Sequence, residues 1–507
     1  MKRCIASVVA TAACAASCRA PDRDPPRAAP PAPLRPAPGI DLDGPVPLPE
    51  RTGPARAGAA APAMLDLVAD RAVVAVAVPR PPLGGSVGFT FGDERPGWVT
   101  RIPDQMQLPA VAYGAGKIYV SGGFESVSFY ALDAETGRVA CATTQLEDNG
   151  PTAAVFEGDR VLFNTESCTL FALDARTGRR LWFRNLGDPT LAQVTTADGL
   201  VYASHPGDGG QELSAYRVKD GEPVWTRSIG AELLAAPVIA GDAIYASTLD
   251  GVVFRFARRT GKLAWSRALD ATTAPWIVDN ELFVTRKRGA REQQIVVAAD
   301  TGKIQREHDQ STGRYAGDVP GSVGALGDGT WQSVWAFEGS RPVVDRGVRY
   351  VAMGGEIRAS DAATGGLLWQ RRDPGASERR SPIAGGGAPD GSAGGAGVLP
   401  RGIDRRSVGS VALAGSQIVI ATRDGQLFGL DVDTGYTLWS YAIGHRVVAE
   451  PVVAHGWVYA STADGYVVAL QVGDRTLDGW HMFGGNPRHD GPVAPPAGEP
   501  PPRAARL

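Results

Sequence analysis

Four polar residues, Glu147, Asp148, Asn149 and Glu166, form the main candidate ligand group in the sequence. Carboxylate and amide oxygens are the ligands that a hard cation such as Ca²⁺ prefers. We expect these residues at the starts of strands, where they could face a central channel. The preferred interpretation is structural, as a polar channel lining or a turn, and a cation site is the alternative.

The histidines give no sign of catalysis. None has the spacing of a zinc ligand set or of a nucleophile with its base. The six are His205, His308, His445, His455, His481 and His489. The glycine runs 385–387 and 394–397 have no Lys-Ser/Thr after them and no strand before them, so they predict a surface loop and not a phosphate-binding loop. The sequence therefore predicts no catalytic residue and no metal ligand.

The composition is that of a folded chain with little net charge. Of its 507 residues, 43% are hydrophobic and 21% are charged, and the formal net charge is −3. Nucleic-acid binding depends on clustered positive charge, so we expect no nucleic-acid partner. The 64 Gly and 39 Pro indicate a chain with many turns.

Residues 1–18 predict an export signal. Lys2-Arg3 precedes a small, apolar run from Cys4 to Ala16, which is too short to span a bilayer. The stretch Ala15-Ala16-Ser17-Cys18 resembles a bacterial lipobox, which implies lipid attachment at Cys18. The alternatives are cleavage without lipid attachment and a weaker lipobox that ends at Cys14.

The folded body lies between two stretches that are poor in hydrophobic residues. Residues 19–64 are rich in Pro, Ala and Arg, with 13 Pro between Arg19 and Ala63. Such a segment buries too little apolar surface to offset its ordering entropy, so we predict a disordered tether. Residues 491–507 have the same composition and the same prediction. Residues 65–490 are predicted to form one domain.

An internal repeat dominates this domain. Its clearest copies, Ala172–Trp182 and Gly429–Trp439, share the pattern Leu-Asp-x-x-Thr-Gly-x-x-Leu-Trp. The positions equivalent to the final Trp are Trp98, Cys141, Trp182, Trp225, Trp265, Arg306, Trp369, Trp439 and Trp480. They lie 43, 41, 43, 40, 41, 63, 70 and 41 residues apart.

This spacing predicts an all-β fold. Short β-branched and aromatic runs alternate with turn pairs such as Gly241-Asp242, which favours tight hairpins. Four strands in a unit of about 42 residues make one β-propeller blade. We therefore predict a single propeller of four-stranded antiparallel blades, with eight blades favoured and seven as the alternative. A strand around Trp98 is expected to close the ring, and the long intervals indicate insertions at 308–330 and 371–406.

The repeat, with the strand and turn at Ala460–Gly465, resembles that of the pyrroloquinoline-quinone-like (PQQ-like) β-propeller family. In that family the repeat Trp docks each blade onto its neighbour. The resemblance implies this structural role for Trp182, Trp225, Trp265, Trp369 and Trp439.

Cys141 and Cys168 are the cysteines that remain once the signal peptide is removed and Cys18 carries lipid. An even pair in an oxidising compartment favours a disulfide. Cys141 stands at a docking-Trp position and Cys168 begins the third strand of the next blade, so a bond would replace a missing indole. The alternative is two buried thiols.

The resemblance implies a choice between two classes of protein. Catalytic members of the family bind a quinone and Ca²⁺, and many carry a pair of adjacent cysteines that this sequence lacks. We therefore expect a chain without a cofactor, similar to the non-catalytic envelope lipoproteins of the BamB type. The alternatives are a quinoprotein dehydrogenase, which would need PQQ and Ca²⁺, and a propeller that binds a glycan or another small ligand.

The expected role is that of a protein-interaction scaffold in the bacterial envelope. We expect a monomer that binds envelope proteins and is held to a membrane by its lipid. Arg19 follows Cys18 in place of the Asp that retains lipoproteins in the inner membrane of enteric bacteria. The prediction is an outer-membrane lipoprotein that faces the periplasm or the cell surface.

Overall fold

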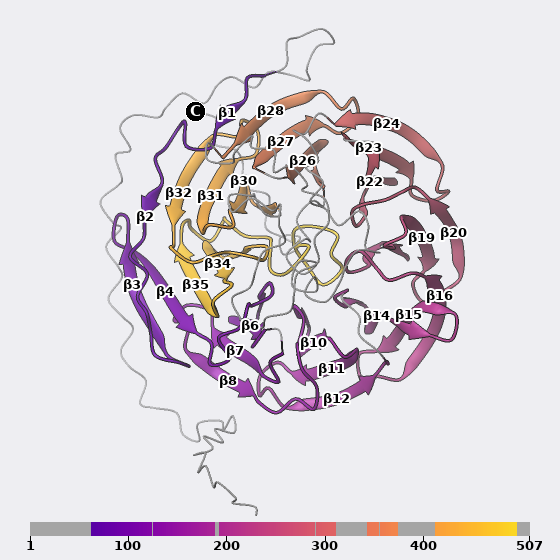
Figure 1. Cartoon of the computed structure of the whole chain (residues 1–507), viewed down its shortest axis with the longest axis horizontal. Coiled ribbons are helices and arrows are strands. Elements are labelled where there is room, and N and C mark those ends of the chain that lie inside the picture. Colours follow the sequence, from indigo (N-terminus) through magenta and orange to yellow (C-terminus); the bar gives the residue numbers. More distant parts are fainter. Residues whose placement is uncertain are drawn as a thin grey trace, which may run out of the picture.

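The computed structural model of the chain describes residues 62–123, 125–187, 192–288, 291–310, 342–353, 355–373 and 411–493. This part of the chain forms eight β-sheets arranged in a ring (Figure 1). It contains strands and turns and no helix, so the all-β, eight-bladed prediction is confirmed. Within these residues, no helix has the length and hydropathy needed to cross a bilayer.

Several predicted features lie outside the described residues. They are the signal segment with Cys18, the tether as far as residue 61, most of both insertions, and the tail from residue 494.

Seven blades take four antiparallel strands from consecutive stretches of chain. From the innermost to the outermost strand, these blades are β5 (Ala112–Gly114), β6 (Lys117–Ser121), β7 (Phe129–Asp133) and β8 (Val139–Thr143); β9 (Val155–Glu157), β10 (Arg160–Asn164), β11 (Thr169–Asp174) and β12 (Arg180–Asn185); β13 (Thr195–Ala197), β14 (Leu200–Gly207), β15 (Gly210–Arg217) and β16 (Pro223–Gly230); β17 (Val238–Ala240), β18 (Ala243–Ser247), β19 (Val252–Ala257) and β20 (Leu263–Ala268); β21 (Trp276–Val278), β22 (Glu281–Arg288), β23 (Arg291–Ala298) and β24 (Ile304–Gln310); β25 (Val343–Asp345), β26 (Val348–Met353), β27 (Glu356–Asp361) and β28 (Leu367–Arg372); and β29 (Ala412–Ala414), β30 (Gln417–Ala421), β31 (Gln426–Asp431) and β32 (Thr437–Ala442).

The eighth blade closes the ring with strands from both ends of the domain. It contains β33 (Val452–Ala454), β34 (Trp457–Ser461) and β35 (Tyr466–Gln471), and its outer strand is β4 (Arg95–Arg101). Trp98 of β4 pairs with Ala469 of β35 in antiparallel register. The strand around Trp98 thus removes the open edge that an unclosed ring would have.

Three N-terminal strands run around the outside of the ring. β1 (Leu65–Asp66) pairs in parallel with β28, β2 (Val74–Ala75) pairs in parallel with β32, and β3 (Ser86–Phe91) pairs with β4. We call residues 62–78 the belt, and Figure 1 shows it in indigo along the outer side of these blades. A buried ion pair fixes the belt, since Arg371 Nη2 lies 3.1 Å from Asp70 Oδ2.

The repeated Asp-x-x-Thr-Gly sequence builds the turn between the third and fourth strands. Asp174 Oδ1 accepts hydrogen bonds from Thr177 N at 2.8 Å and Thr177 Oγ1 at 2.7 Å. Asp side chains commonly satisfy the backbone of a turn in this way. The same bonds recur at Asp133, Asp361 and Asp431.

The outer-strand indoles join neighbouring blades through these turns. Trp225 Nε1 donates to Arg258 O of the next blade at 2.8 Å, and Tyr202 donates to the same oxygen at 3.1 Å. The indole lies over Gly261, where an added Cβ would come within 2.6 Å of the ring. The equivalent indole bonds run from Trp98 to Ala134, Trp182 to Val218, Trp265 to Ala299, and Trp369 to Val432.

Trp439 differs from the expected docking role. Its Nε1 donates to Gln417 Oε1 of its own blade at 2.9 Å. The following blade ends in Val472, Gly473 and Asp474 and has no Thr-Gly turn over which an indole could lie. Instead, Val472 O accepts a hydrogen bond from Arg95.

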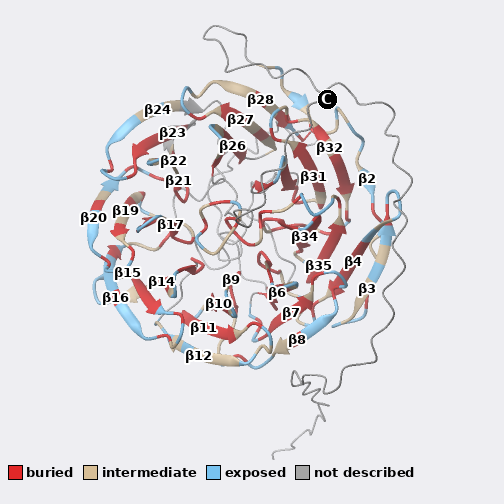
Figure 2. Ribbon diagram, turned by 180° about the vertical axis from the view of Figure 1, so that it is seen from behind, coloured by how far each residue is buried: buried red, intermediate tan, exposed pale blue. Residues whose placement is uncertain are grey.

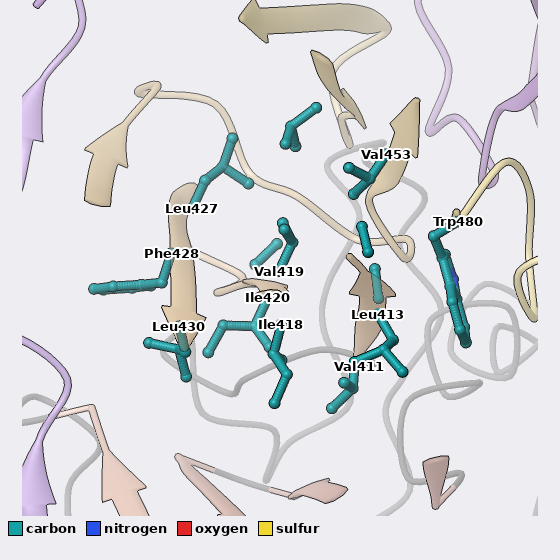
Figure 3. Close-up of a cluster of buried hydrophobic side chains, with 14 of the residues drawn as sticks. Val411, Leu413, Ile418, Val419, Ile420, Leu427, Phe428, Leu430, Val453 and Trp480 are labelled. Atoms are coloured by element: carbon teal, nitrogen blue, oxygen red, sulfur yellow. The ribbon is translucent and has the colours of Figure 1, made fainter. Parts of the chain in front are cut away.

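The hydrophobic core lies between the blades. In β30 and β31, consecutive side chains such as Ile418 and Val419 are buried, because a neighbouring blade covers each face of the sheet (Figure 3). Figure 2 shows the buried residues on the inner and middle strands and much of the exposed surface on outer strands such as β16 and β20.

Replacing the docking glycine should therefore cost more than replacing a glycine of similar conformation elsewhere. Gly261 has a φ of +66° and Gly241 a φ of +58°, but a Cβ at Gly241 would meet nothing within 4 Å. Both Ala variants should lose about 1 kcal/mol from the left-handed backbone. G261A should lose about 1–3 kcal/mol more, because its methyl group displaces Trp225. Urea unfolding of both variants measures the difference, and equal losses would contradict the docking contact.

Candidate functional site

The structure brings three of the four candidate ligands together at the loops of the blade β9–β12. Thr165 Oγ1 donates to Asp148 Oδ2 at 2.8 Å, and Ser167 Oγ donates to Asn149 Oδ1 at 3.2 Å. The backbone of Glu166 is also tied in, through its N–H to Gly150 O at 3.1 Å.

Glu147 lies apart from this group. Its Oε1 is 3.1 Å from Arg180 Nη2, and both side chains are substantially exposed. Among the described residues, no group of three His, Cys, Asp or Glu could hold a metal ion. The oxygens of Asp148 and Asn149 serve as acceptors for neighbouring hydroxyls, which fits the structural interpretation of the group.

Glu166 has the most perturbed carboxyl of the group. Burial raises its pKa from the ordinary 4.5 to about 7. A backbone hydrogen bond from Glu125 N at 3.4 Å opposes the rise, while the carboxylates of Glu125 and Asp148 add to it. Glu166 therefore carries its negative charge at a cost to the folded state at neutral pH.

A second site, which the sequence analysis did not predict, lies at the centre of the ring. Residues 478–493, which we call the central plug, follow β35 and contact the innermost strands of several blades (Figure 1). Four inner-strand N–H groups donate to plug carbonyls. The pairs are Tyr113 to His481 at 2.6 Å, Val453 to Trp480 at 2.7 Å, Thr196 to Pro487 at 2.8 Å, and Ile239 to Arg488 at 3.0 Å.

Aromatic side chains fill the space between the plug and the blades. Phe483 is 3% exposed and packs among alanines that precede the inner strands of four blades. Those alanines are Ala110, Ala153, Ala236 and Ala449. Trp480 stacks on Trp276 of β21 with ring centroids 6.2 Å apart and planes at 5°. Figure 3 shows Trp480 beside Leu413 and Val453.

Histidines fasten the plug. His489 is buried, with Nε2 at 2.9 Å from Val194 O and Nδ1 at 2.6 Å from Phe483 O. His481 Nε2 lies 2.7 Å from Asp478 Oδ1, which also accepts the N–H of His455 at 3.1 Å. The contacts of His455, His481 and His489 therefore position the plug. Among the described residues these histidines do not belong to a group that could hold a metal ion.

One signal in the sequence could have revealed the plug. Trp480, Met482 and Phe483 are three large apolar residues within a glycine-rich segment after the last strand. The repeat count assigned Trp480 to a docking position because its interval of 41 residues matches the repeat. In the structure β4 supplies that outer strand, and Trp480 lies on the ring axis with Val453 as its backbone partner.

The two cysteines are not bonded to each other. Cys141 Sγ lies near Gly178, in the turn after β11, whereas Cys168 precedes β11 and its Sγ donates to Ser204 O at 3.7 Å. The two sites are separated by the length of β11, about 20 Å at roughly 3.3 Å per residue. A disulfide requires Cα atoms within about 7 Å. The structure therefore replaces the expected disulfide with two buried thiols in different contacts.

The raised pKa of Glu166 gives a testable dependence of stability on pH. A carboxyl whose folded pKa is raised contributes stability that is complete below its unfolded pKa near 4.5 and is lost as the pH rises through about 7. E166Q should therefore be more stable than the wild type at pH 8, and its stability should change less between pH 4.5 and 8. Urea unfolding across this range measures both effects.

The matched control for this prediction is E147Q, at the exposed carboxyl beside Arg180. It should keep the pH profile of the wild type, since surface ion pairs contribute little. If the free energy of unfolding of E166Q depended on pH as that of the wild type does, the raised pKa of Glu166 would be contradicted.

Comparisons with known proteins agree with this architecture. A sequence model of the family described as outer membrane protein assembly factor BamB matches residues 170–323 and 398–488. A quinoprotein ethanol dehydrogenase of Pseudomonas putida is 32% identical over 117 residues, which are 21% of this chain and 17% of that protein. The match thus spans less than a fifth of the length of this relative.

Solved structures share the fold. BamB from Moraxella catarrhalis has a TM-score of 0.52 at 17% identity, over 76% of this chain and 100% of that chain. Quinohemoprotein alcohol dehydrogenase from Comamonas testosteroni has a TM-score of 0.50 at 14% identity, over 73% of this chain and 76% of that chain. Taken with the repeat and the ring of eight blades, these matches support a PQQ-like repeat β-propeller.

Proposed function

We propose that this chain is a non-catalytic scaffold of the bacterial envelope, exported, lipid-anchored at Cys18 and specialised for binding other proteins. The central plug is the observation that carries the proposal. Phe483 and Trp480 occupy the ring axis, so the outer surfaces of the propeller are left for binding. The family match to an outer membrane protein assembly factor supports the same role.

The second candidate is a quinone-dependent dehydrogenase, which the local similarity to quinoprotein ethanol dehydrogenase favours. Such an enzyme needs a site for a flat quinone and for Ca²⁺. Within the described residues the carboxylates do not gather into a cation site, and aromatic side chains of the chain itself pack on the axis. The residues therefore do not fit these groups, and the scaffold role is preferred.

Anchoring is tested by the C18S variant, with C14S as the matched control. The wild type and C14S should incorporate labelled fatty acid and sediment with outer membranes. C18S should lose the label and appear in the soluble periplasmic fraction, because one or two buried acyl chains supply the membrane affinity. Equal fractionation of C18S and C14S would contradict the anchor.

The scaffold role is tested by crosslinked affinity purification from envelope membranes. The wild type should recover at least one envelope protein in stoichiometric amount. Recovery of no partner would count against the role. Addition of PQQ and Ca²⁺ to the purified chain separates the two candidates, because reduction of a dye with an alcohol substrate would establish the dehydrogenase.

A further inference from the structure

Among the strands of the described residues, five of the eight blades end in an outer strand with which no other strand pairs. β8, β12, β16, β20 and β24 stand at the edges of their sheets, whereas the belt or β3 pairs with β28, β32 and β4. We call the edges of these five strands the open rim. An uncovered edge strand presents backbone N–H and C=O groups that can pair with a further strand.

The belt shows how an extended segment binds an outer strand of this propeller. It runs parallel to β28 and β32, and outer-strand side chains donate to its carbonyls. Thr437 Oγ1 donates to Leu67 O at 2.6 Å, and Gln370 Nε2 donates to Pro62 O at 2.7 Å.

Charge pairing adds to these bonds. Asp66 Oδ1 of the belt lies 2.9 Å from Arg372 Nε, and Asp70 pairs with Arg371 in a buried position. Belt binding therefore combines backbone pairing with contacts between acidic and arginine side chains.

The open rim repeats the features that the belt uses. Arg371 stands two residues after the docking Trp, and the same repeat position holds an arginine on β12, β16 and β20. These are Arg184, Arg227 and Arg267. Each already donates to a turn carbonyl of the next blade, at Gly221, Gly261 and Thr301 respectively, and Arg184 also pairs with Glu222. A guanidinium carries five N–H donors, so its remaining N–H groups can bind the carboxylates of an acidic segment along three consecutive blades.

Each open outer strand also exposes one large apolar side chain. The exposed fractions are 38% at Val139, 41% at Phe183, 44% at Val224, 48% at Leu263 and 41% at Ile304. On the covered strand β32, the position equivalent to Leu263 is Thr437, which is 1% exposed. Figure 2 shows the contrast between β20, which is largely exposed, and β32, which is largely buried.

We propose that β12, β16 and β20 of the open rim bind an extended, acidic and apolar segment of a partner protein, which adds one short parallel strand to each sheet that it crosses, as the belt does at β28 and β32. The partner's carboxylates pair with the rim arginines, and its apolar side chains cover Phe183, Val224 and Leu263. This inference rests on the proposed scaffold function and specifies the surface and the partner chemistry. Its occupant is a partner protein, because the chain's own belt is already held on β28 and β32.

The test uses the purified full chain and a synthetic peptide of its own belt sequence, residues 62–78, as the probe. Hydrogen exchange with mass spectrometry should show saturable protection of the amides in β12, β16 and β20. A peptide N-methylated at alternate residues should not bind, because strand addition requires its N–H groups. A peptide with both Asp residues changed to Asn should bind about tenfold more weakly, since each exposed charge pair contributes modestly.

The variant L263K should weaken peptide binding about tenfold, because a lysine on an edge opposes strand addition and removes apolar contact. V127K is the matched control, since Val127 is 41% exposed on a loop between β6 and β7 and lies off the rim. It should bind the peptide as the wild type does.

Several results would overturn the proposal. Protection confined to β28 and β32 would mean that the peptide only exchanges with the belt. Equal binding of the N-methylated peptide would exclude strand addition. Protection of the rim that rises with protein concentration alone, with a dimer in sedimentation, would make the rim a contact between two copies. None of these results depends on Cys18 or on an envelope partner, so failure of the rim and failure of the scaffold role are distinguishable.

Discussion

The ring depends on one acceptor, the backbone carbonyl in the turn between the third and fourth strands of a blade. At Arg258 this oxygen accepts both the indole of Trp225 and the hydroxyl of Tyr202 from the preceding blade. Each such bond contributes about 1 kcal/mol net, and burial of an indole adds at most roughly 4–6 kcal/mol. The contact requires a glycine beneath the indole, which explains why each of these turns has one: Gly137, Gly221, Gly261, Gly302 and Gly435.

The central plug fills the space inside the ring that these contacts between blades hold together. Because each innermost strand is an edge of its sheet, it has backbone N–H groups that no strand of its own blade pairs with. The central plug satisfies four of them and places Phe483 among the small side chains of four blades. Because the plug fills the centre of the ring, we expect partners to bind the outer surfaces, where the belt pairs with β28 and β32.

The blades could be predicted from the sequence because their signals are local. Asp174, Thr177 and Gly178 must stand within five residues to make the turn, and the docking Trp follows at a fixed distance. The belt could not be predicted and the plug was missed, since each binds through backbone groups of distant strands and occurs once in the chain. The plug's signal was the apolar group Trp480, Met482 and Phe483, whose Trp fits the repeat interval. The cysteines were mispredicted for a similar reason. Cys141 and Cys168 stand at nearby positions of the repeat, but Cys141 on β8 lies beside the turn after β11, whereas Cys168 directly precedes β11. Among the candidate ligands, the sequence grouped Asp148 correctly with Glu166 but could not show that Glu147 pairs with Arg180.

The central claim is that the chain's own residues close the axis of the propeller. It is tested most directly by amide hydrogen exchange at Tyr113, Val453, Thr196 and Ile239, whose N–H groups donate to the plug. The account predicts that these four amides exchange as slowly as those in the middle strands of the same blades. Exchange at the rate of exposed loops would contradict it, because the axis would then be open to solvent and to ligands.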